Sequence, residues 1–336
     1  MELLNAWHLV ETLTPGEMTV VSSGGKTREW SSVERLSPAP DISIRGLVRI
    51  TTETGASQEV TGVSKRKQRE YFLHTIPVLG PSGEVHGVQV WVGDTDGPTT
   101  PPRTVSGIAW HLTRSVITQT LEASMMSGVH PEDHVPQRTP AEYTAKAVKF
   151  DDAENLFAAA LMPEHGRRWD APMSVLHADG RVMNWHCWAR GRTDGDNLGL
   201  RLLWHDVTDT VPPAMPTLKE LGLPSALESA KTCVAVFDAL TGTLTMWLPE
   251  APSWVQWRDV PSGRDIIHAD DRICFVQALR KWGHDTGPVM TTVRMRALAE
   301  GGLRWQPVSI ELRQYPGQLS DRLVLAVVPS DLQAPR

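Results

Sequence analysis

Residues 173–209 carry a regular hydrophobic pattern of three runs separated by turn residues. The first run stops at Asp179-Gly180, a dipeptide that supplies the positive φ of a tight hairpin. In the second run, residues 182–190, successive side chains would alternate between the two faces of a strand. A third run, residues 198–207, follows a polar turn. The pattern therefore predicts three antiparallel strands.

The same order of strands and turns recurs along the chain. Residues 289–328 repeat it around a turn at 300–302, and residues 69–92 give a shorter version around a turn at 81–83. Two strands and helical segments precede the three-strand block each time. The sequence therefore predicts an α+β protein of three tandem modules, each a five- to six-stranded antiparallel sheet flanked by short helices.

Two segments without apolar periodicity separate the modules. Residues 94–103 are rich in Gly, Pro and Thr, which is typical of a linker. Residues 210–231 contain two capping-box spacings, which predict two short helices broken at Gly222 and Pro224. The domains expected from these boundaries are 1–100, 104–210 and 214–336.

Composition narrows the classes of function. The chain of 336 residues has a net charge of −6 with both signs interspersed, so no nucleic-acid partner is expected. The basic run 65–69 favours a solvated loop over a docking patch for an acidic partner. Three scattered cysteines indicate a reducing compartment, and no apolar run is long enough to span a membrane. We expect a cytoplasmic protein.

The motifs of catalysis and metal binding are weak. No phosphate-binding loop, zinc-protease motif or nucleophile elbow occurs. The run 130–134 has two histidines four apart, but Pro131 argues against the helix that would place both rings on one face, so a polar loop is favoured over a metal site. Asp270 and Asp271, after His268, are expected to cap a helix at 272–282. Cys187 has no indicated base, so we predict no catalytic residue and no metal.

Several segments resemble the PAS family of sensor domains. Residues 226–247 resemble its opening helix and strands, 265–279 its His-Pro-Asp-Asp segment with Ala269 in place of proline, and 301–305 its Gly-x-x-Trp hairpin. Residues 206–209 resemble the Asp-Ile-Thr-Glu that closes many PAS domains. By length and layout the whole chain resembles actinobacterial tandem PAS–GAF–PAS proteins of undefined biochemical role.

This resemblance implies a GAF domain in the middle, although the pattern of 173–209 by itself reads as PAS, and both assignments stay open. It also implies a role in sensing. The cysteine motif that binds flavin covalently in light-sensing PAS domains is missing, so no cofactor is expected.

The third module is expected to hold a hollow between the helix 272–282 and the sheet. An apolar or aromatic small molecule fits such a lining better than a phosphate-bearing nucleotide. The candidate pocket residues are Val234, Val236, Met246, Cys274, Met295, Trp305 and Leu325, with Trp110 and Trp188 in the earlier modules.

The tryptophans on predicted strands are expected to be buried. They are Trp185, Trp188, Trp204, Trp247 and Trp305. Trp254 and Trp257 fit neither a strand nor a helix period, so they are the candidates for an exposed interaction surface.

The sequence thus predicts a non-catalytic sensor or scaffold that acts through small-molecule-responsive or constitutive contacts with an unidentified signalling protein. A homodimer is compatible with this role. One alternative is an enzyme that acts on a small metabolite in the central module through His177, Asp179 or His186. Another is a pure interaction protein whose modules are filled.

Overall fold

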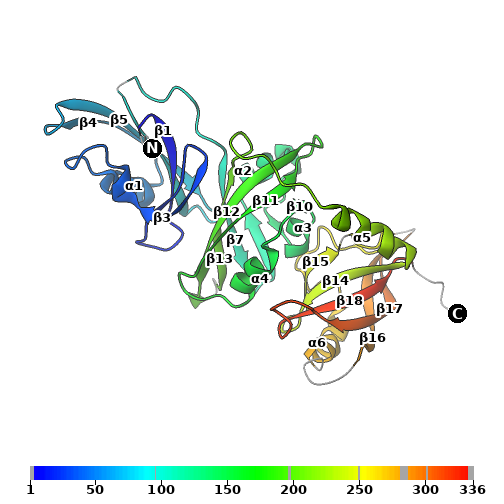
Figure 1. The fold of residues 1–336 in the computed structure, drawn as a ribbon. Helices are drawn as coiled ribbons and strands as arrows, with labels where there is room; N and C mark the ends of the chain where they lie inside the picture. The colour runs from blue at the N-terminus through cyan, green and yellow to red at the C-terminus, as the bar shows by residue number, and fades with distance from the viewer. Residues whose placement is uncertain are drawn as a thin grey trace. The chain divides into compact units, whose positions relative to one another are not determined.

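The computed structural model describes residues 4–94, 96–195, 198–248, 250–280, 287–299 and 302–331. The chain forms three sheets with short helices between their strands, as Figure 1 shows. None of the helices in the described residues is long and apolar enough to cross a membrane.

The first sheet has six strands in the order β3-β2-β1-β6-β5-β4. Helix α1 (Ile44–Thr54) packs on β5 and β6, and its buried positions recur at helical spacing. Ser43 caps its first turn, and Gly55 in the left-handed conformation ends it. The strands are β1 (Ala6–Glu11), β2 (Thr19–Ser23), β3 (Lys26–Ser32), β4 (Gln58–Ser64), β5 (Arg69–Leu79) and β6 (Val85–Gly93).

The second sheet has seven strands in the order β10-β11-β12-β13-β7-β8-β9. Its antiparallel block β11-β12-β13 confirms the three strands predicted in 173–209, with Gly180 at φ +90° in the hairpin turn. Its strands are β7 (Val105–His111), β8 (Val116–Gln119), β9 (Gln137–Arg138), β10 (Ala147–Lys149), β11 (Arg168–Leu176), β12 (Val182–Arg192) and β13 (Gly199–Asp206). The helices of this stretch are α2 (Leu121–Met126), α3 (Pro140–Thr144) and α4 (Ala153–Leu161).

The third sheet has five strands in the order β15-β14-β18-β17-β16. Helix α6 (Arg272–Arg280) buries Phe275 and Leu279. The end of the predicted helix, with Trp282, lies outside the described residues, as does Gly301 in the hairpin turn. The strands are β14 (Thr232–Asp238), β15 (Thr243–Leu248), β16 (Val289–Ala299), β17 (Gly302–Gln314) and β18 (Leu323–Pro329).

The three sheets share one topology. If the strands of the third sheet are counted along the chain, their order in space is second, first, fifth, fourth, third. The first sheet has the same order without β3, and the second has it without the short strands β9 and β10. The repeat predicted from the hydrophobic pattern is therefore present in the strand connections, in an α+β protein with three sheets.

The connection before the third sheet differs from the prediction. Helix α5 (Leu218–Ser229) is one helix that contains Pro224, where two short helices were expected. The capping box at Thr217 and Glu220 is formed, whereas Ser225 lies inside the helix. The ring of Pro224 fixes φ near the helical value. It also removes one backbone hydrogen bond and crowds the carbonyl one turn earlier, so it weakens the helix.

By their internal contacts the described residues divide into two compact units. Unit 1 contains Met1–Trp110, Thr118–Pro136 and Met162–Ala214, and unit 2 contains His111–Ile117, Gln137–Leu161 and Met215–Arg336. The three domain boundaries expected from the sequence remain a prediction.

Within unit 1, one face of the first sheet packs on strands β12 and β13. A buried apolar cluster fills this interface: Leu9, Leu13, Val21, Val78, Trp188 and Leu203. Beside the cluster, Arg190 donates to Glu11 over 2.7 Å, and both side chains are almost fully buried. The guanidinium of Arg190 also lies 4.7 Å from the ring centroid of Trp30. Two sheets are therefore joined through a buried, largely apolar interface.

Candidate functional site

A hollow of about 750 Å³ lies in unit 2, and we name it the α5 hollow. Its walls are formed by residues 144–153, helix α5 with the preceding Pro216, the end of β15, residues 250–258 and Leu298 of β16. Most of the lining is apolar. The apolar side chains include Val148, Phe150, Leu221, Leu223, Met246 and Leu248.

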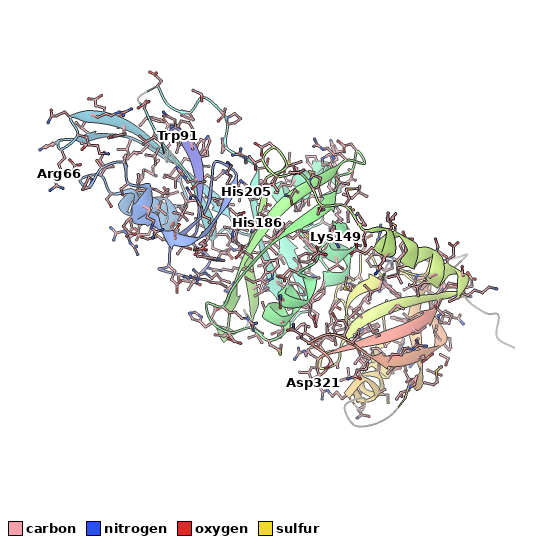
Figure 2. All side chains as sticks on the ribbon, in the orientation of Figure 1. Arg66, Trp91, Lys149, His186, His205 and Asp321 are labelled. Atoms are coloured by element: carbon pink, nitrogen blue, oxygen red, sulfur yellow. The ribbon has the colours of Figure 1, made fainter. Side chains whose placement is uncertain are left out.

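Lys149 links the wall at residues 144–153 to helix α5. Its ammonium group contacts the carboxylates of Asp151 and Glu220, and Figure 2 shows it beside the start of α5. The hydrogen bond from Lys149 is the main cause that lowers the pKa of Glu220 to about 2. The second oxygen of Glu220 accepts from the backbone N–H of Thr217 over 2.7 Å and completes the capping box. One carboxylate thus both starts the helix and ties it to the wall.

The lining carries charges of both signs, with Lys149 and Arg258 positive and Glu220 and Glu250 negative. Arg258 is exposed, lies 4.8 Å from the ring centroid of Trp257, and forms no ion pair with the described residues. Burial lowers the pKa of the neighbouring Lys146, and the charges of Arg138 and Arg258 lower it further. Arg138 itself is paired with Glu142 over 3.2 Å. The guanidinium of Arg258 could donate two parallel hydrogen bonds to an anionic group bound in the hollow.

Helix α5 has few packing contacts of its own. It contacts β14, yet no residue of the helix is buried. Three of its leucines are exposed, namely Leu218 at 88%, Leu221 at 58% and Leu223 at 46% of full exposure. Leu298 of β16, which also lines the hollow, is half exposed as well. The hollow therefore has an apolar rim, and one wall is a weakly held helix.

The hollow expected between the helix at 272–282 and the sheet is occupied by core side chains. The rings of Phe237 and Phe275 meet edge to face with centroids 5.0 Å apart, and Met295 is completely buried beside them. Alternate residues of β14 and β18 face this cluster, namely Ala235, Phe237, Val324, Ala326 and Val328. The predicted pocket position is thus a packed core.

The predicted pocket residues are not brought together. Side chains alternate between the two faces of a strand, and the residues that face α6 are the neighbours of the predicted ones. The predicted residues therefore point to the other face of the sheet: Val234, Val236 and Leu325. Met246 lines the α5 hollow instead. Cys274 is exposed. Trp110 and Trp188 are buried in unit 1, where Trp188 belongs to the interface between sheets.

Three predictions about tryptophan exposure were wrong. Trp305 is 39% exposed, and its ring meets His268 edge to face at 4.9 Å. Trp254 and Trp257 are 7% and 9% exposed, so they are no interaction surface. Their segment is held on β16 by a bridge between Val255 and Ala297, and it lacks a period because it is neither strand nor helix. Trp185, Trp188, Trp204 and Trp247 are buried, as predicted.

The residues of the enzyme alternative lie in two separate places. His177 and Asp179 contact each other over 2.8 Å at the β11–β12 hairpin turn. His186 lies within β12, where its ring contacts Asp170 over 3.0 Å and Thr27 over 3.2 Å. His186 and His205 are direct partners on β12 and β13, as Figure 2 shows. The three residues therefore do not converge on one pocket.

The other candidate groups have structural roles. Burial raises the pKa of Cys187 far above the ordinary thiol value, so it stays protonated. His134 contacts Ser124 over 2.9 Å, and His130 caps a short 3-10 turn in the expected polar loop. The helix cap predicted at Asp270 and Asp271 is made instead by His268, whose ring accepts from the N–H of Asp270, while Asp271 binds Arg294. Among the described residues, no cluster of His, Cys, Asp and Glu has the arrangement of a metal site.

Lys149, Glu220 and Arg258 were not expected at a site from the sequence. The capping box marked Glu220 as a helix start, but its contact with Lys149 spans 71 positions of the chain. Arg258 follows a tryptophan in an aperiodic segment, so only the fold shows that it stands at a hollow.

Comparison with known proteins identifies fold relatives. Residues 6–102 match the family model described as Rv3651-like, N-terminal. No curated protein matches the chain with significant similarity. A solved uncharacterized protein from Mycobacterium tuberculosis is similar with a TM-score of 0.76 and 24% identity, over 97% of this chain and 96% of that one. At this identity the likeness concerns the fold.

Two sensory proteins show much weaker likeness. A sensory box histidine kinase/response regulator from Burkholderia thailandensis has a TM-score of 0.26 and 16% identity over 38% of this chain and 91% of that one. An RNA-binding light-oxygen-voltage receptor has a TM-score of 0.26 and 12% identity over 66% and 94%. Neither score is high enough to support an argument about function. The established relationship is the one to the Mycobacterium tuberculosis fold, with a matched family segment at residues 6–102.

Proposed function

We propose that the protein is a non-catalytic sensor and scaffold of tandem PAS- and GAF-like modules, and that its sensing site is the α5 hollow. The observation that carries the proposal is a largely apolar hollow of about 750 Å³ closed on one side by a weakly packed helix. Sites for small molecules commonly have volumes of about 300–1,000 Å³, apolar walls and a few polar groups that fix orientation. The common strand order of the three sheets supports the PAS- and GAF-like assignment.

The chemistry of the lining selects the ligand. Apolar side chains such as Phe150 and Met246 suit an alkyl or aromatic body. Arg258, which lines the hollow and has no ion pair among the described residues, suits one carboxylate, although Glu250 also lines the hollow. Lys149 is already neutralised by two carboxylates and adds no second anion site. The proposed ligand is an apolar or aromatic monocarboxylic acid.

Helix α5 is the proposed output element. Because no residue of α5 is buried, its position depends on Glu220, Lys149 and the side chains Leu221 and Leu223 that line the hollow. A ligand that contacts these leucines shifts the population of docked α5, since it binds the docked and undocked states with different affinity. The exposed leucines then become more or less accessible to a signalling protein.

The scaffold part of the proposal rests on unit 1. Its two sheets share a filled interface with a buried ion pair, which favours one constitutive body over a hinge. The three cysteines are free thiols, which agrees with the reducing, cytoplasmic setting expected from the sequence. No catalytic role is proposed, because the residues of the enzyme alternative lie apart.

Native mass spectrometry of the purified full chain tests for a retained ligand. Calorimetry then compares aryl and alkyl carboxylates with their matched primary amides. We expect the carboxylate to bind about tenfold more tightly, the size of one charge-assisted hydrogen-bond pair. Arg258→Gln should remove this difference and leave amide binding unchanged, while the matched surface change Arg313→Gln should leave both unchanged. Equal binding of acid and amide, or no binding at millimolar concentration, would contradict the proposal.

A further inference from the structure

The edges of the three sheets are protected in different ways. An unprotected edge strand offers free backbone N–H and C=O groups to another strand, so proteins cover, shorten or charge their edges. Strand β15 is covered by α3, and β16 is bridged by the segment that contains Val255 and Ile267. Strands β9 and β10 have two and three residues. Strand β3 carries Lys26, Arg28 and Glu29.

Strand β4 is neither covered nor short, and Glu59 is its only charged residue. It has seven residues, pairs with β5 alone, and contains no proline, lysine or arginine. Its apolar residues Val60 and Val63 are 42% and 58% exposed. Among the described residues, no backbone hydrogen bond reaches β4 from its outer side. In this sheet β4 is therefore ready to accept another strand.

The charges along this edge are arranged in two halves. Glu59 lies near the start of the strand with a side chain that is 64% exposed, and its carboxylate lies 3.6 Å from the ring of His74 on β5. Lys65 and Arg66 follow the strand at the hairpin tip, where both are exposed and form no ion pair with the described residues. Figure 2 shows Arg66 at the outer end of this hairpin. The edge is thus acidic at one end and basic at the other.

Such an edge is complementary to itself. In an antiparallel pair of two β4 strands, the register that pairs all seven residues places Thr61 opposite Thr61 and Val63 opposite Glu59 of the second copy. Lys65 directly follows the last residue of β4, so it comes next to the Glu59 end of the second copy, at a distance that long side chains can span. The two-fold axis produces this contact twice, as in a closed symmetric dimer.

We propose that β4 is the dimerisation edge of the protein, where two copies join their first sheets into one continuous sheet. The occupant is a second copy of this chain, because both the charges and the strand length match under two-fold symmetry. This inference is independent of the α5 hollow and of its ligand, since β4 lies in unit 1.

Cysteine cross-linking of the full chain tests the edge and its register. Exposed Cys274 is first replaced by serine, while Cys187 is buried and Cys233 is partly buried. Thr61→Cys should then form a disulfide-linked dimer under mild oxidation, because directly opposed residues have Cα atoms about 4.5–5.5 Å apart. Glu59→Cys and Val63→Cys should each cross-link poorly alone and efficiently when mixed. Equal cross-linking of all three single variants would overturn the register.

Sedimentation at several concentrations provides a second measurement. The unmodified chain should have twice its 37.1 kDa mass. Lys65→Glu should weaken the dimer on the order of tenfold because two ion pairs are lost, and combination with Glu59→Lys should restore it. A monomer at 100 µM would overturn the proposal. So would a monomer that binds a polyglutamate peptide through Lys65 and Arg66, since that result would assign the edge to an acidic partner.

Discussion

Unit 1 and unit 2 contain sheets of similar strand order that are packed differently. In unit 1, sheet packs on sheet, and the space is filled by Trp188 and its neighbours around the buried pair of Glu11 and Arg190. In unit 2, helix α5 stands beside the end of β15 with its leucines exposed, and a hollow of about 750 Å³ remains. A filled interface resists opening, whereas a hollow with a weakly held wall can respond to a ligand. This difference is the basis for proposing that unit 1 supports and that the α5 hollow of unit 2 responds.

The largest expected effect breaks the filled interface. Arg190→Met leaves the carboxylate of Glu11 buried without its charged partner, and an uncompensated buried charge costs about 3–5 kcal/mol. The free energy of unfolding from denaturant titration measures the loss. Adding Glu11→Met should recover much of it, because an apolar pair of similar volume can replace a buried ion pair.

The control for this change is an exposed pair. Arg313 and Glu311 contact each other over 2.8 Å, and the Arg313 side chain is 55% exposed. Arg313→Met should therefore change stability by less than about 1 kcal/mol. A loss below about 1 kcal/mol for Arg190→Met as well would mean that Glu11 is not held in a buried interface.

The second prediction compares two tryptophans. Trp188→Ala removes a completely buried ring from the sheet interface and should cost about 3–5 kcal/mol. Trp305→Ala removes a ring that is 39% exposed, so its cost should be near 1 kcal/mol. Both are measured by thermal or denaturant unfolding. Similar costs for the two substitutions would contradict the difference in burial between the two rings.

The sequence predicted local strand patterns well because they depend on neighbouring residues. Asp179-Gly180 marked the β11–β12 hairpin, and alternation in β12 marked a strand with two buried faces. Alternation separates the two faces of a strand, but it does not say which face a helix will cover. A register shift between Val236 and Phe237 makes that choice harder still, and the faces were assigned wrongly in the third sheet.

The candidate site could not be predicted because long-range contacts create it. Residues 144–153 and helix α5 meet through Lys149 and Glu220, which no periodicity connects. Trp254 and Trp257 are buried because their segment bridges β16, a contact that an aperiodic stretch does not reveal.

A third prediction uses the pH dependence of stability to test the burial of His205 in unit 1. Burial, followed by the charge of Arg103 and then that of His186, lowers the pKa of His205 from 6.5 to about 3. The unfolded chain binds a proton at this position below pH 6.5, and the folded chain does not. The contribution of His205 to the free energy of unfolding is therefore fully present above pH 6.5. It falls as the pH decreases toward 3, by at most about 1.4 kcal/mol per pH unit.

The test compares the parent chain with His205→Phe, which keeps a ring and removes the titrating nitrogens. The unfolding free energy of the parent should decline more steeply between pH 6.5 and pH 5 than that of the variant. Equal slopes would mean that His205 does not remain neutral in the folded chain.

The smallest expected effect is on the local stability of helix α5, the proposed responsive element. Glu220→Ala removes the reciprocal half of the capping box and the contact with Lys149. Amide hydrogen exchange across α5 should become about fivefold faster, as expected for a lost helix cap. The midpoint of global unfolding should hardly move, because no residue of α5 is buried. Glu228→Ala, at an exposed position of the same helix, is the matched control and should leave exchange unchanged. A large fall in global stability for Glu220→Ala would show that α5 supports the core of unit 2, and the proposed division between a supporting and a responsive region would then be wrong.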